Sequence, residues 1–485
     1  MNYKMMGRFI AQILALEAAF MVQALLISLA GAETPAIRGF VLAMVITLAI
    51  AAALYLGSKG AERSGFYAKE GLVCVGISWI VLSLTGCLPF YLSGEIPHFI
   101  DAFFEIVSGF TTTGASILTA VEDFSRGIIY WRSFSHWLGG MGVLVFLLAV
   151  APLRGGSGGF TMHLLRAESP GPNVGKLVPK MRQTAGILYF LYILLTLLDI
   201  AFLLVGHMPL FDAVCTAFGT AGTGGFGIKN DSMAGYSPYL QNVCTVFMLL
   251  FGVNFSCYYL LLMRKLGSVL KDEELRLYLG LILGSIVLIT LDLRGVYATF
   301  EETLRHAAFQ VSSIITTTGF ATTDFDQWPG LSKCILLLLM VVGACAGSTG
   351  GGLKCGRVLL IFKSLRRNIS QVLHPQKVQV IRTNGRVESE RVVANTNAYL
   401  AAYVSLIALS FLLISVDDLS ITTNLSAVLA CFNNIGPGFE LVGATGNYSV
   451  FSDFSKLVLV LDMLAGRLEI FPILVLFSRT TWKNR

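Results

Sequence analysis

A short run of Gly and Thr residues that recurs four times is the feature that most constrains the fold of this chain. The first copy is Gly-Phe-Thr-Thr-Thr-Gly at residues 109–114, and the third is Ile-Thr-Thr-Thr-Gly-Phe at 315–320. The second and fourth copies, at 217–226 and 431–438, are spelled differently. Each copy follows a short amphipathic stretch between two long apolar segments. Aligned on Gly114, Gly224, Gly319 and Gly436, the copies divide the chain into four cycles of span, half-span with loop, and span.

Composition identifies the solvent in which those cycles must fold. Hydrophobic residues make up 55% of the 485 residues and charged residues 13%, whereas a soluble domain has about 25% charged residues. One soluble core could not bury so many apolar side chains, so lipid must surround much of the chain. The nine cysteines are scattered without CxxC spacing, which argues against a disulfide framework or a zinc site. The N-terminal apolar stretch lacks a small-residue cleavage site and is interpreted as a retained helix.

The apolar runs are long enough to be counted as membrane spans. Two leading runs, at 9–30 and 38–56, precede four pairs at 71–90 and 128–152, 184–206 and 240–263, 277–293 and 331–365, and 394–416 and 455–477. The half-spans at 100–114, 210–224, 303–319 and 421–436 have about a dozen residues before their glycine, and a membrane helix needs about 20. Fourteen full spans are therefore excluded, and ten full spans with four half-spans are predicted.

The predicted fold is an all-α polytopic membrane protein. Four pseudo-symmetric helix–pore loop–helix repeats surround one pore, and two transmembrane helices precede them. The leading helices occupy residues 1–65, and the repeats occupy 66–155, 156–266, 267–385 and 386–485.

The distribution of charge predicts the orientation. Most of the 35 Lys and Arg residues fall in segments that this layout assigns to the cytoplasm, such as 154–182, 264–276 and 354–391, in agreement with the positive-inside rule. Acidic residues such as Glu301 and Asp324 gather on the opposite face, where they would concentrate cations. Both termini are thus predicted to be cytoplasmic, and the basic segment 354–391 could contact anionic lipid headgroups or an acidic regulator.

The four loops have the composition of an ion filter. Half-helices that end inside the membrane leave carbonyl groups unpaired, and such backbone persists there only where it lines a cavity. Rings of carbonyls can replace the water around a dehydrated potassium ion. Aiming successive carbonyls at one axis requires positive φ, which glycine adopts without steric cost. A single Gly/Thr loop would be unremarkable, but four at the same place in each cycle favour a four-sided filter.

Three further stretches complete a resemblance to a known family. They are Trp-Leu-Gly-Gly-Met-Gly at 137–142, the Gly-rich run 343–354, and Met-Leu-Ala-Gly-Arg-Leu-Glu at 463–469. With the four loops, they make the chain resemble the Trk/Ktr/HKT superfamily of potassium transporters over essentially its whole length. Within that superfamily it is most similar to the bacterial TrkH/TrkG branch. The resemblance implies a potassium-conducting subunit of the bacterial inner membrane, with K+ as the transported ion. It also implies a homodimer bound by a cytosolic nucleotide-binding regulator of the TrkA type, with no nucleic acid involved.

The resemblance also implies which residues hold the ion. By position, the potassium ligands are Thr112, Thr113 and Gly114; Thr223 and Gly224; Thr317, Thr318 and Gly319; and Asn434, Ile435 and Gly436. The second and fourth copies depart from the Thr-Thr-Gly pattern. Only one or two carbonyl layers would then be shared by all four sides, with weaker selectivity than in a symmetric potassium channel.

The second span of the third cycle contains a Gly-rich interruption. Its five glycines between 343 and 352 lose roughly 5 kcal/mol of helix preference, at about 1 kcal/mol each. A small-residue patch for close helix packing is one interpretation. The consecutive Gly350, Gly351 and Gly352 favour a broken helix whose loop lies under the filter, and the resemblance implies that this loop is the gate.

Arg467 is a cation inside the last apolar span. Burying it costs at least about 3 kcal/mol, so it needs partners. It could snorkel to the cytoplasmic edge, although the chain from there to Arg479 is apolar or neutral apart from Glu469. We favour the hypothesis that it enters the conduction path and donates to carbonyls of the 343–352 loop, as an electrostatic barrier to cations. Asp462 and Glu469 are expected to be structural partners.

Two transport mechanisms remain open, and catalysis is not expected. No nucleophile–base pair or paired carboxylates are evident, so the chain is not expected to be an enzyme. Alternating-access symporters of potassium with protons or sodium usually have inverted repeats, whereas the repeats predicted here run in parallel around one axis. That arrangement favours a channel-like pore, with symport as the alternative.

Overall fold

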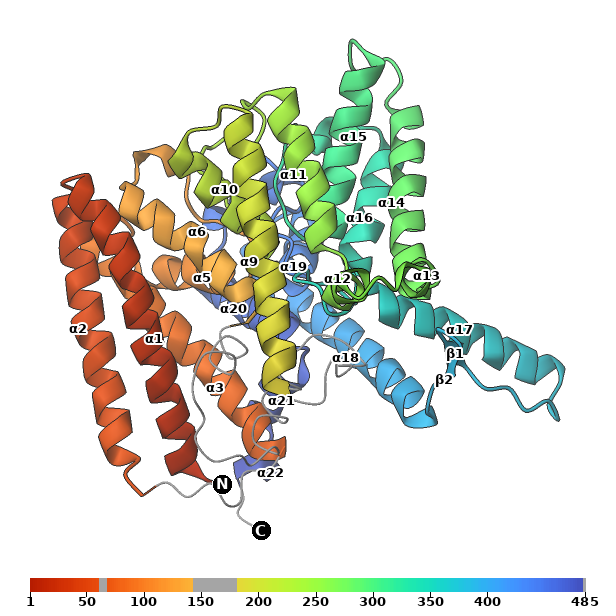
Figure 1. The fold of residues 1–485 in the computed structure, drawn as a ribbon, viewed down its shortest axis with the longest axis horizontal. Helices are drawn as coiled ribbons and strands as arrows, with labels where there is room; N and C mark the ends of the chain where they lie inside the picture. The colour runs from red at the N-terminus through yellow and green to blue at the C-terminus, as the bar shows by residue number, and fades with distance from the viewer. Residues whose placement is uncertain (61–67, 143–180, 483–485) are drawn as a thin grey trace.

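The computed structural model describes residues 1–60, 68–142 and 181–482, and it is almost entirely helical (Figure 1). Two long helices, α1 (Tyr3–Ala30) and α2 (Thr34–Gly57), pack against each other at one edge of the molecule. Helix α1 also contacts α6, and α2 contacts α4. These are the two predicted leading helices, which stand outside the four repeats.

Each repeat has a long first helix, a short helix and a second helix, and in repeats 2, 3 and 4 the second helix is segmented. Repeat 1 contains α3 (Ala68–Gly86), α4 (Leu88–Ser93), α5 (Phe99–Phe110) and α6 (Arg126–Gly140). Repeat 2 contains α9 (Met181–Val205), α10 (Leu210–Gly222), α11 (Pro238–Phe251) and α12 (Phe255–Leu262). Repeat 3 contains α14 (Glu273–Asp292), α15 (Phe300–Ile315), α16 (Gly330–Val342) and α17 (Cys355–Leu373). Repeat 4 contains α18 (Glu390–Ile414), α19 (Ile421–Phe432), α20 (Asp453–Arg467) and α21 (Phe471–Phe477).

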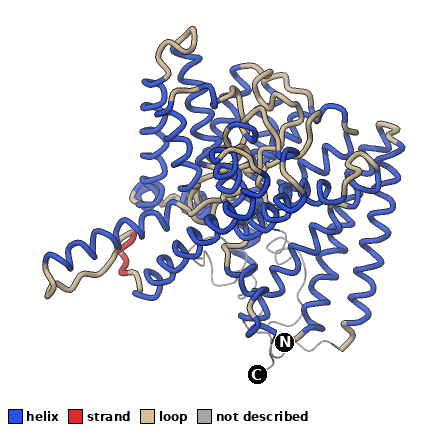
Figure 2. The backbone as a smooth tube through the Cα atoms, turned by 180° about the vertical axis from the view of Figure 1, so that it is seen from behind, coloured by secondary structure: helices blue, strands red, loops and turns tan. Residues whose placement is uncertain are grey.

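The short helices α5, α10, α15 and α19 form a closed ring with the second helices. Each short helix packs against the second helix of its own repeat: α5 against α6, α10 against α11, and α15 against α16. Helices α10 and α15 also pack against the second helix of the preceding repeat, α6 and α11 respectively. Helix α19 contacts α16 and α20, and α20 contacts α5 again. The series of contacts returns to its start, so the four repeats surround one axis. From behind, the helices enclose a centre of loops (Figure 2).

Minor elements occupy the connections. Helices α17 and α18 extend away from the bundle, with the antiparallel hairpin β1 (Arg382–Thr383) and β2 (Arg386–Val387) between them (Figure 1). Helix α13 (Leu266–Leu270) links repeats 2 and 3, and α22 (Arg479–Trp482) follows repeat 4. Short 3-10 helices lie at Val121–Asp123, Phe325–Gln327, Ser415–Asp417, Glu440–Val442 and Tyr448–Val450.

The outside of the bundle is apolar, as a lipid-facing surface must be. Val45 on α2, Phe190 on α9 and Leu283 on α14 are 60%, 62% and 63% exposed. Six described helical segments are long and apolar enough to cross a membrane, and the bent pair α11 and α12 could be a seventh. The predicted class, an all-α polytopic membrane protein with four pseudo-symmetric repeats and two N-terminal helices, is confirmed.

The second helices are more broken than the sequence predicted. The break at 343–352 is confirmed, because α16 ends at Val342 and α17 begins at Cys355. The prediction of uninterrupted spans over 240–263 and 455–477 was wrong. Helices α11 and α12 are bent by 88° to each other, and α20 is separated from α21. In repeat 1, α6 ends at Gly140. The remainder of the predicted 128–152 span beyond residue 142, the boundaries near 65 and 155, and most of the basic segment 154–182 lie outside the described residues.

Local residues cap or end the helices at the two unpredicted breaks. In repeat 2, the Asn254 side chain accepts the N–H of Ser256 at 2.9 Å and caps α12. In repeat 4, Glu469 and Ile470 have positive φ, of 60° and 65°, which no α-helix can continue through. Pro472 then starts α21, where its missing N–H is not needed.

Candidate ion-conduction site

The four short helices end in the same backbone turn at the centre of the molecule. Thr112, Thr223, Thr317 and Asn434 have φ of 55°, 54°, 59° and 55°. The next residue in each case donates its N–H, at 2.8 Å, to the carbonyl five residues earlier: Thr113 to Ser108, Gly224 to Gly219, Thr318 to Ser313 and Ile435 to Ala430. Three of the left-handed residues are β-branched threonines, for which this conformation is costly. The four copies are therefore equivalent in backbone, although their sequences differ.

This shared turn corrects the alignment of the second copy. Two residues after the left-handed residue, φ is 80° at Gly114, 73° at Gly225, 86° at Gly319 and 96° at Gly436. Gly225, and not Gly224, is thus the counterpart of Gly114. The sequence Gly-Thr-Gly-Gly at 222–225 offers several glycines for alignment, and only the hydrogen-bond pattern distinguishes them.

The predicted site residues converge in a closed ring. A Cβ atom placed on Gly114 would overlap the carbonyl oxygen of Gly224, one on Gly225 would overlap that of Thr318, and one on Gly319 that of Ile435. On Gly436 it would lie 2.7 Å from the carbonyl oxygen of Thr113. The ring glycine of each repeat therefore lies against a carbonyl of the next repeat. That carbonyl belongs to the residue immediately before the next repeat's own ring glycine. The fourth contact returns to the first repeat.

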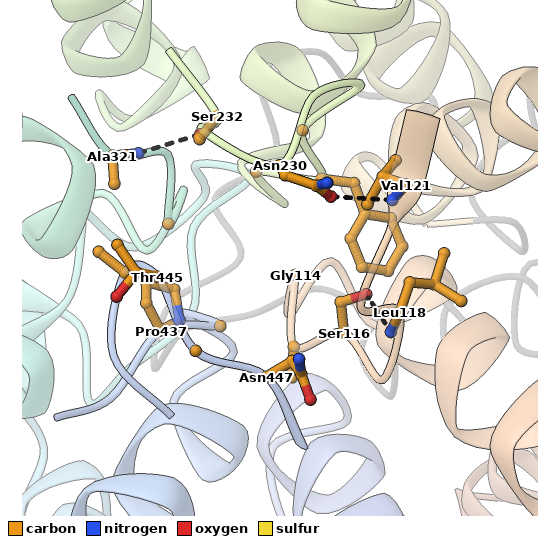
Figure 3. Close-up of a pocket in the computed structure, with 18 of the residues that line it drawn as sticks. Gly114, Ser116, Leu118, Val121, Asn230, Ser232, Ala321, Pro437, Thr445 and Asn447 are labelled. Carbon is orange, nitrogen blue, oxygen red and sulfur yellow. Dashed lines mark hydrogen bonds between the residues drawn. The ribbon is translucent and has the colours of Figure 1, made fainter. Parts of the chain in front are cut away.

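The ring opens on one side into a cavity. This cavity of about 140 Å³ is lined by residues of all four repeats, including the four ring glycines. Figure 3 shows loop segments from the four repeats approaching it from different sides, with Gly114, Asn230, Ala321 and Pro437 on different loops. A water needs roughly 10–15 Å³ of such space, so several waters fit directly above the ring.

Side chains behind the ring are bonded to one another. The hydroxyls of Thr111 and Thr113 are 2.8 Å apart, as are those of Thr316 and Thr318. In repeat 4, Asn434 Nδ2 donates to Thr113 Oγ1 and to the carbonyl of Met463, both at 3.0 Å. These bonds stabilise the loops from outside the ring. Main-chain carbonyl oxygens are then the groups available to contact an ion at the centre.

One ring carbonyl has a side-chain donor. The buried Tyr448 hydroxyl donates to the carbonyl of Gly436 at 2.7 Å. Tyr448→Phe is expected to lower the free energy of unfolding by about 1 kcal/mol, the usual net value of one such bond. Thermal unfolding of the purified protein in detergent measures this. Tyr239→Phe is the control, because its exposed hydroxyl bonds Phe202 at 3.3 Å away from the ring; an equal effect of both variants would contradict the prediction.

The interrupted segment of repeat 3, residues 343–354, lies against the inner end of the ring. Gly351 donates its N–H to Thr317 Oγ1 at 2.6 Å. A Cβ on Gly351 would overlap the carbonyl oxygen of Asn433, and one on Gly350 would lie 2.8 Å from that of Thr316. The predicted position of this loop under the filter agrees with these contacts.

The same loop is bonded to the break in repeat 2. Cys345 donates its N–H to the carbonyl of Gly252, and Phe255 donates to the carbonyl of Gly347, both at 3.1 Å. Ala346 donates to Glu274 Oε1 at 2.6 Å. The backbone groups freed by one broken helix thus pair with those freed by another, which lets both survive inside the membrane. Sequence reasoning missed the partner, although Gly252 and Asn254 inside an apolar run were a signal.

Arg467 contacts this loop as expected. Its Nη1 donates to the carbonyl of Thr349 at 2.9 Å, and its Nη2 donates to the carbonyls of Gly140, at 2.6 Å, and Gly139. Snorkelling to the membrane edge is therefore wrong. The contacts with α6 were not predicted, although the Gly-Gly pair at 139–140 is typical of close backbone approach.

Three charged residues near Arg467 also have partners: Asp462 and Glu469, which the sequence pointed to, and Lys354, which it did not. Asp462 accepts from Ser410 at 2.6 Å, and Glu469 forms an ion pair with Arg357, so both are structural partners. Lys354 is buried, and its Nζ donates to the carbonyl of Gly350 inside the loop. Lys354 was not among the site residues predicted from the sequence.

A buried ion pair outside the ring was also missed. Arg132 on α6 and Glu105 on α5 are joined at 2.6 Å with almost no exposure. Arg132 also donates to the carbonyl of Gly227 at 2.9 Å, while Glu105 accepts from Ser116 and Ile117, both at 2.9 Å. The pair links the outer segments of repeats 1 and 2. Such a pair is tolerable at this depth because its hydrogen-bonding groups find partners.

Comparisons with known proteins agree with this geometry. Residues 36–483 match the TrkH family, described as a cation transport protein. The chain is 37% identical over 458 residues to the Trk system potassium uptake protein TrkH of Salmonella typhimurium, covering 92% of each chain. It is 34% identical over 423 residues to the Trk system potassium uptake protein TrkG of Escherichia coli, covering 86% of each.

The fold is similar to a solved structure. The crystal structure of the potassium transporter TrkH from Vibrio parahaemolyticus matches with a TM-score of 0.87 and 30% sequence identity, covering 100% of both chains. Similarity of this extent in sequence and fold agrees with the resemblance seen in the loops. The chain therefore belongs to the TrkH family, a family of cation transport proteins and not of enzymes.

Proposed function

We propose that this protein takes up potassium across the bacterial inner membrane through the ring of main-chain oxygens, here called the filter. The filter comprises residues 112–114, 223–225, 317–319 and 434–436. The observation that carries the proposal is the closed series of glycine-to-carbonyl contacts, in which the four loops meet around one centre. The names of the relatives, potassium uptake proteins, support potassium as the ion.

The filter would bind K+ by replacing its hydration with carbonyl oxygens. One layer would come from Thr113, Gly224, Thr318 and Ile435, and the layer below from Thr112, Thr223, Thr317 and Asn434. Gly114, Gly225, Gly319 and Gly436 would form the outer edge. Because the four sides differ in side chain and support, selectivity for K+ over Na+ would be lower than in a symmetric pore.

The loop 343–352, with Gly350, Gly351 and Gly352, would be the gate on the cytoplasmic side of the filter. Arg467 supports this role, since its guanidinium joins Thr349 of the loop to the end of α6. A fixed positive charge at this depth repels cations, and breaking these bonds would let the loop move. Movement of the loop would thus open the conduction path.

The protein would act as a homodimer with a cytosolic nucleotide-binding regulator of the TrkA type, in contact with membrane lipid. The projecting α17 supports such contacts, because Val372 and Leu373 near its end are 79% and 69% exposed. The start of α1 and helix α22 lie at the same end of the molecule (Figure 1). Both termini would therefore be cytoplasmic.

Flux measurements separate this proposal from symport. A potassium-uptake-deficient bacterium expressing the chain with its regulator should grow at low external potassium. In proteoliposomes, the reversal potential should follow the potassium gradient and be unchanged by pH. A reversal potential that shifts with the proton or sodium gradient, beyond what permeation of the ions alone explains, would instead indicate coupled transport. Absence of potassium flux would reject both mechanisms.

A further inference from the structure

Helix α6 differs from the other second helices at one buried position facing the filter. Helices α6, α11, α16 and α20 follow the N-cap residues Ser125, Ser237, Pro329 and Ser452. At the same distance beyond each cap stand His136, Met248, Met340 and Met463, all of them buried. Only repeat 1 therefore has a polar side chain at this place.

In repeat 2, the filter lacks a side chain at a position where the other three repeats have one. The residue after the left-handed turn is Thr113, Thr318 or Ile435 in three repeats, but Gly224 in repeat 2. The three atoms nearest to a Cβ placed on Gly224 all belong to the His136 imidazole, the third of them, Cε1, at 2.6 Å. The imidazole of repeat 1 thus occupies the volume that a filter side chain takes in the other repeats.

The imidazole is also bonded on both of its nitrogens. His136 Nδ1 lies 2.9 Å from the carbonyl oxygen of Gly109, and the N–H of Phe226 points to Nε2 at 3.2 Å. One neutral tautomer satisfies both contacts, with Nδ1–H donating and Nε2 accepting. The Phe226 ring packs against the imidazole at 4.1 Å between centroids. Gly109 lies in the last turn of the short helix of repeat 1, and Phe226 follows the filter glycine of repeat 2, so one side chain joins two quarters of the ring.

We propose that His136 is a positioning residue of the filter, which sets the separation between the repeat 1 and repeat 2 carbonyls and compensates for the missing side chain at Gly224. This inference rests on the proposed function of the ring. A methionine, as in the other three helices, would fill similar space but could make neither hydrogen bond. Without both bonds, the carbonyl of Gly224 would no longer be held at a fixed distance from that of Thr113.

Selectivity is the measurement that tests the proposal. In proteoliposomes, His136→Met is expected to lower the K+/Na+ permeability ratio about fivefold, the change that corresponds to losing roughly one net hydrogen bond. His136→Gln is expected to retain most of the ratio, since an amide offers one acceptor and donors. An unchanged ratio in a folded His136→Met protein, or an equal loss in both variants, would overturn the proposal.

A double-mutant cycle keeps the test valid if His136→Met folds poorly. Gly224→Ala should reduce potassium uptake strongly, because its methyl group overlaps the imidazole. His136→Ala combined with Gly224→Ala should recover part of that loss, whereas independent effects would add. Additive effects would contradict the assigned pairing.

Gly319→Ala distinguishes failure of this inference from failure of the proposed function. Gly319 lies on the repeat 3–repeat 4 side of the ring, against Ile435, and not against His136. If Gly319→Ala lowers the K+/Na+ ratio and His136→Met does not, the filter assignment stands and the positioning role is wrong. If neither changes the ratio, the filter assignment itself is wrong.

Discussion

Replacing Gly114 by serine is expected to lower the K+/Na+ permeability ratio at least about tenfold, the factor that corresponds to roughly 1.4 kcal/mol. Gly114 has φ of 80°, where a residue with a Cβ pays about 1–2 kcal/mol. The new Cβ would also overlap the carbonyl oxygen of Gly224. In the proposed filter that oxygen belongs to the layer formed by all four repeats, so its displacement would disturb the whole ring. Reversal potentials with potassium on one side and sodium on the other give the ratio directly.

Gly94→Ser is the matched control for this variant. Gly94 also has φ of 80°, but nothing lies within 4 Å of a Cβ placed there. It therefore reproduces the backbone cost without the overlap, and its permeability ratio should equal that of the unmodified protein. If Gly94→Ser changed selectivity as much as Gly114→Ser, loss of stability and not the close approach in the ring would be the cause.

Arg467→Ala is expected to raise potassium flux in the absence of the regulator by about 30-fold. The guanidinium bonds three carbonyls that join the loop 343–352 to the end of α6. Hydrogen bonds to charged groups contribute about 1.5–3 kcal/mol each, so a shift of about 2 kcal/mol toward the open loop is a conservative expectation. Removing the charge also lowers the barrier that a cation meets. Potassium efflux from loaded proteoliposomes measures the change.

Arg467→Lys separates the charge from the hydrogen bonds. An ammonium keeps the charge but cannot reach three carbonyls with the planar geometry of a guanidinium. Its flux should lie between those of the unmodified protein and Arg467→Ala. Unchanged flux in Arg467→Ala, with regulation intact, would show that the arginine has only a structural role.

The sequence could predict the features that repeat or that violate the composition of a membrane helix. The four half-spans were too short to cross the membrane, and the glycines of 343–352 were too many for a helix. Arg467 could not remain unpaired among apolar residues. Each of these follows from local residues and the properties of the lipid.

Features that depend on distant partners could not be predicted. The break after Gly252 is stabilised by Cys345, which is far away in the sequence. The alignment of the second loop with the others depends on which N–H donates to the carbonyl of Gly219. From the sequence alone, several glycines could be aligned with Gly114. Arg132 and His136 were not singled out from the sequence, because their contacts with Glu105 and Gly224 depend on how the helices pack.

The unlike residues around the ring have a consequence for how permeation can be adjusted. In a pore assembled from four identical chains, every substitution appears fourfold, and a modest change becomes a drastic one. Here Thr113, Gly224, Thr318 and Ile435 belong to a single polypeptide, so one wall can be altered while three stay as they were. Ion preference in the proposed pore could therefore be tuned in small, separate steps, and a bound ion would have no reason to lie on an exact symmetry axis.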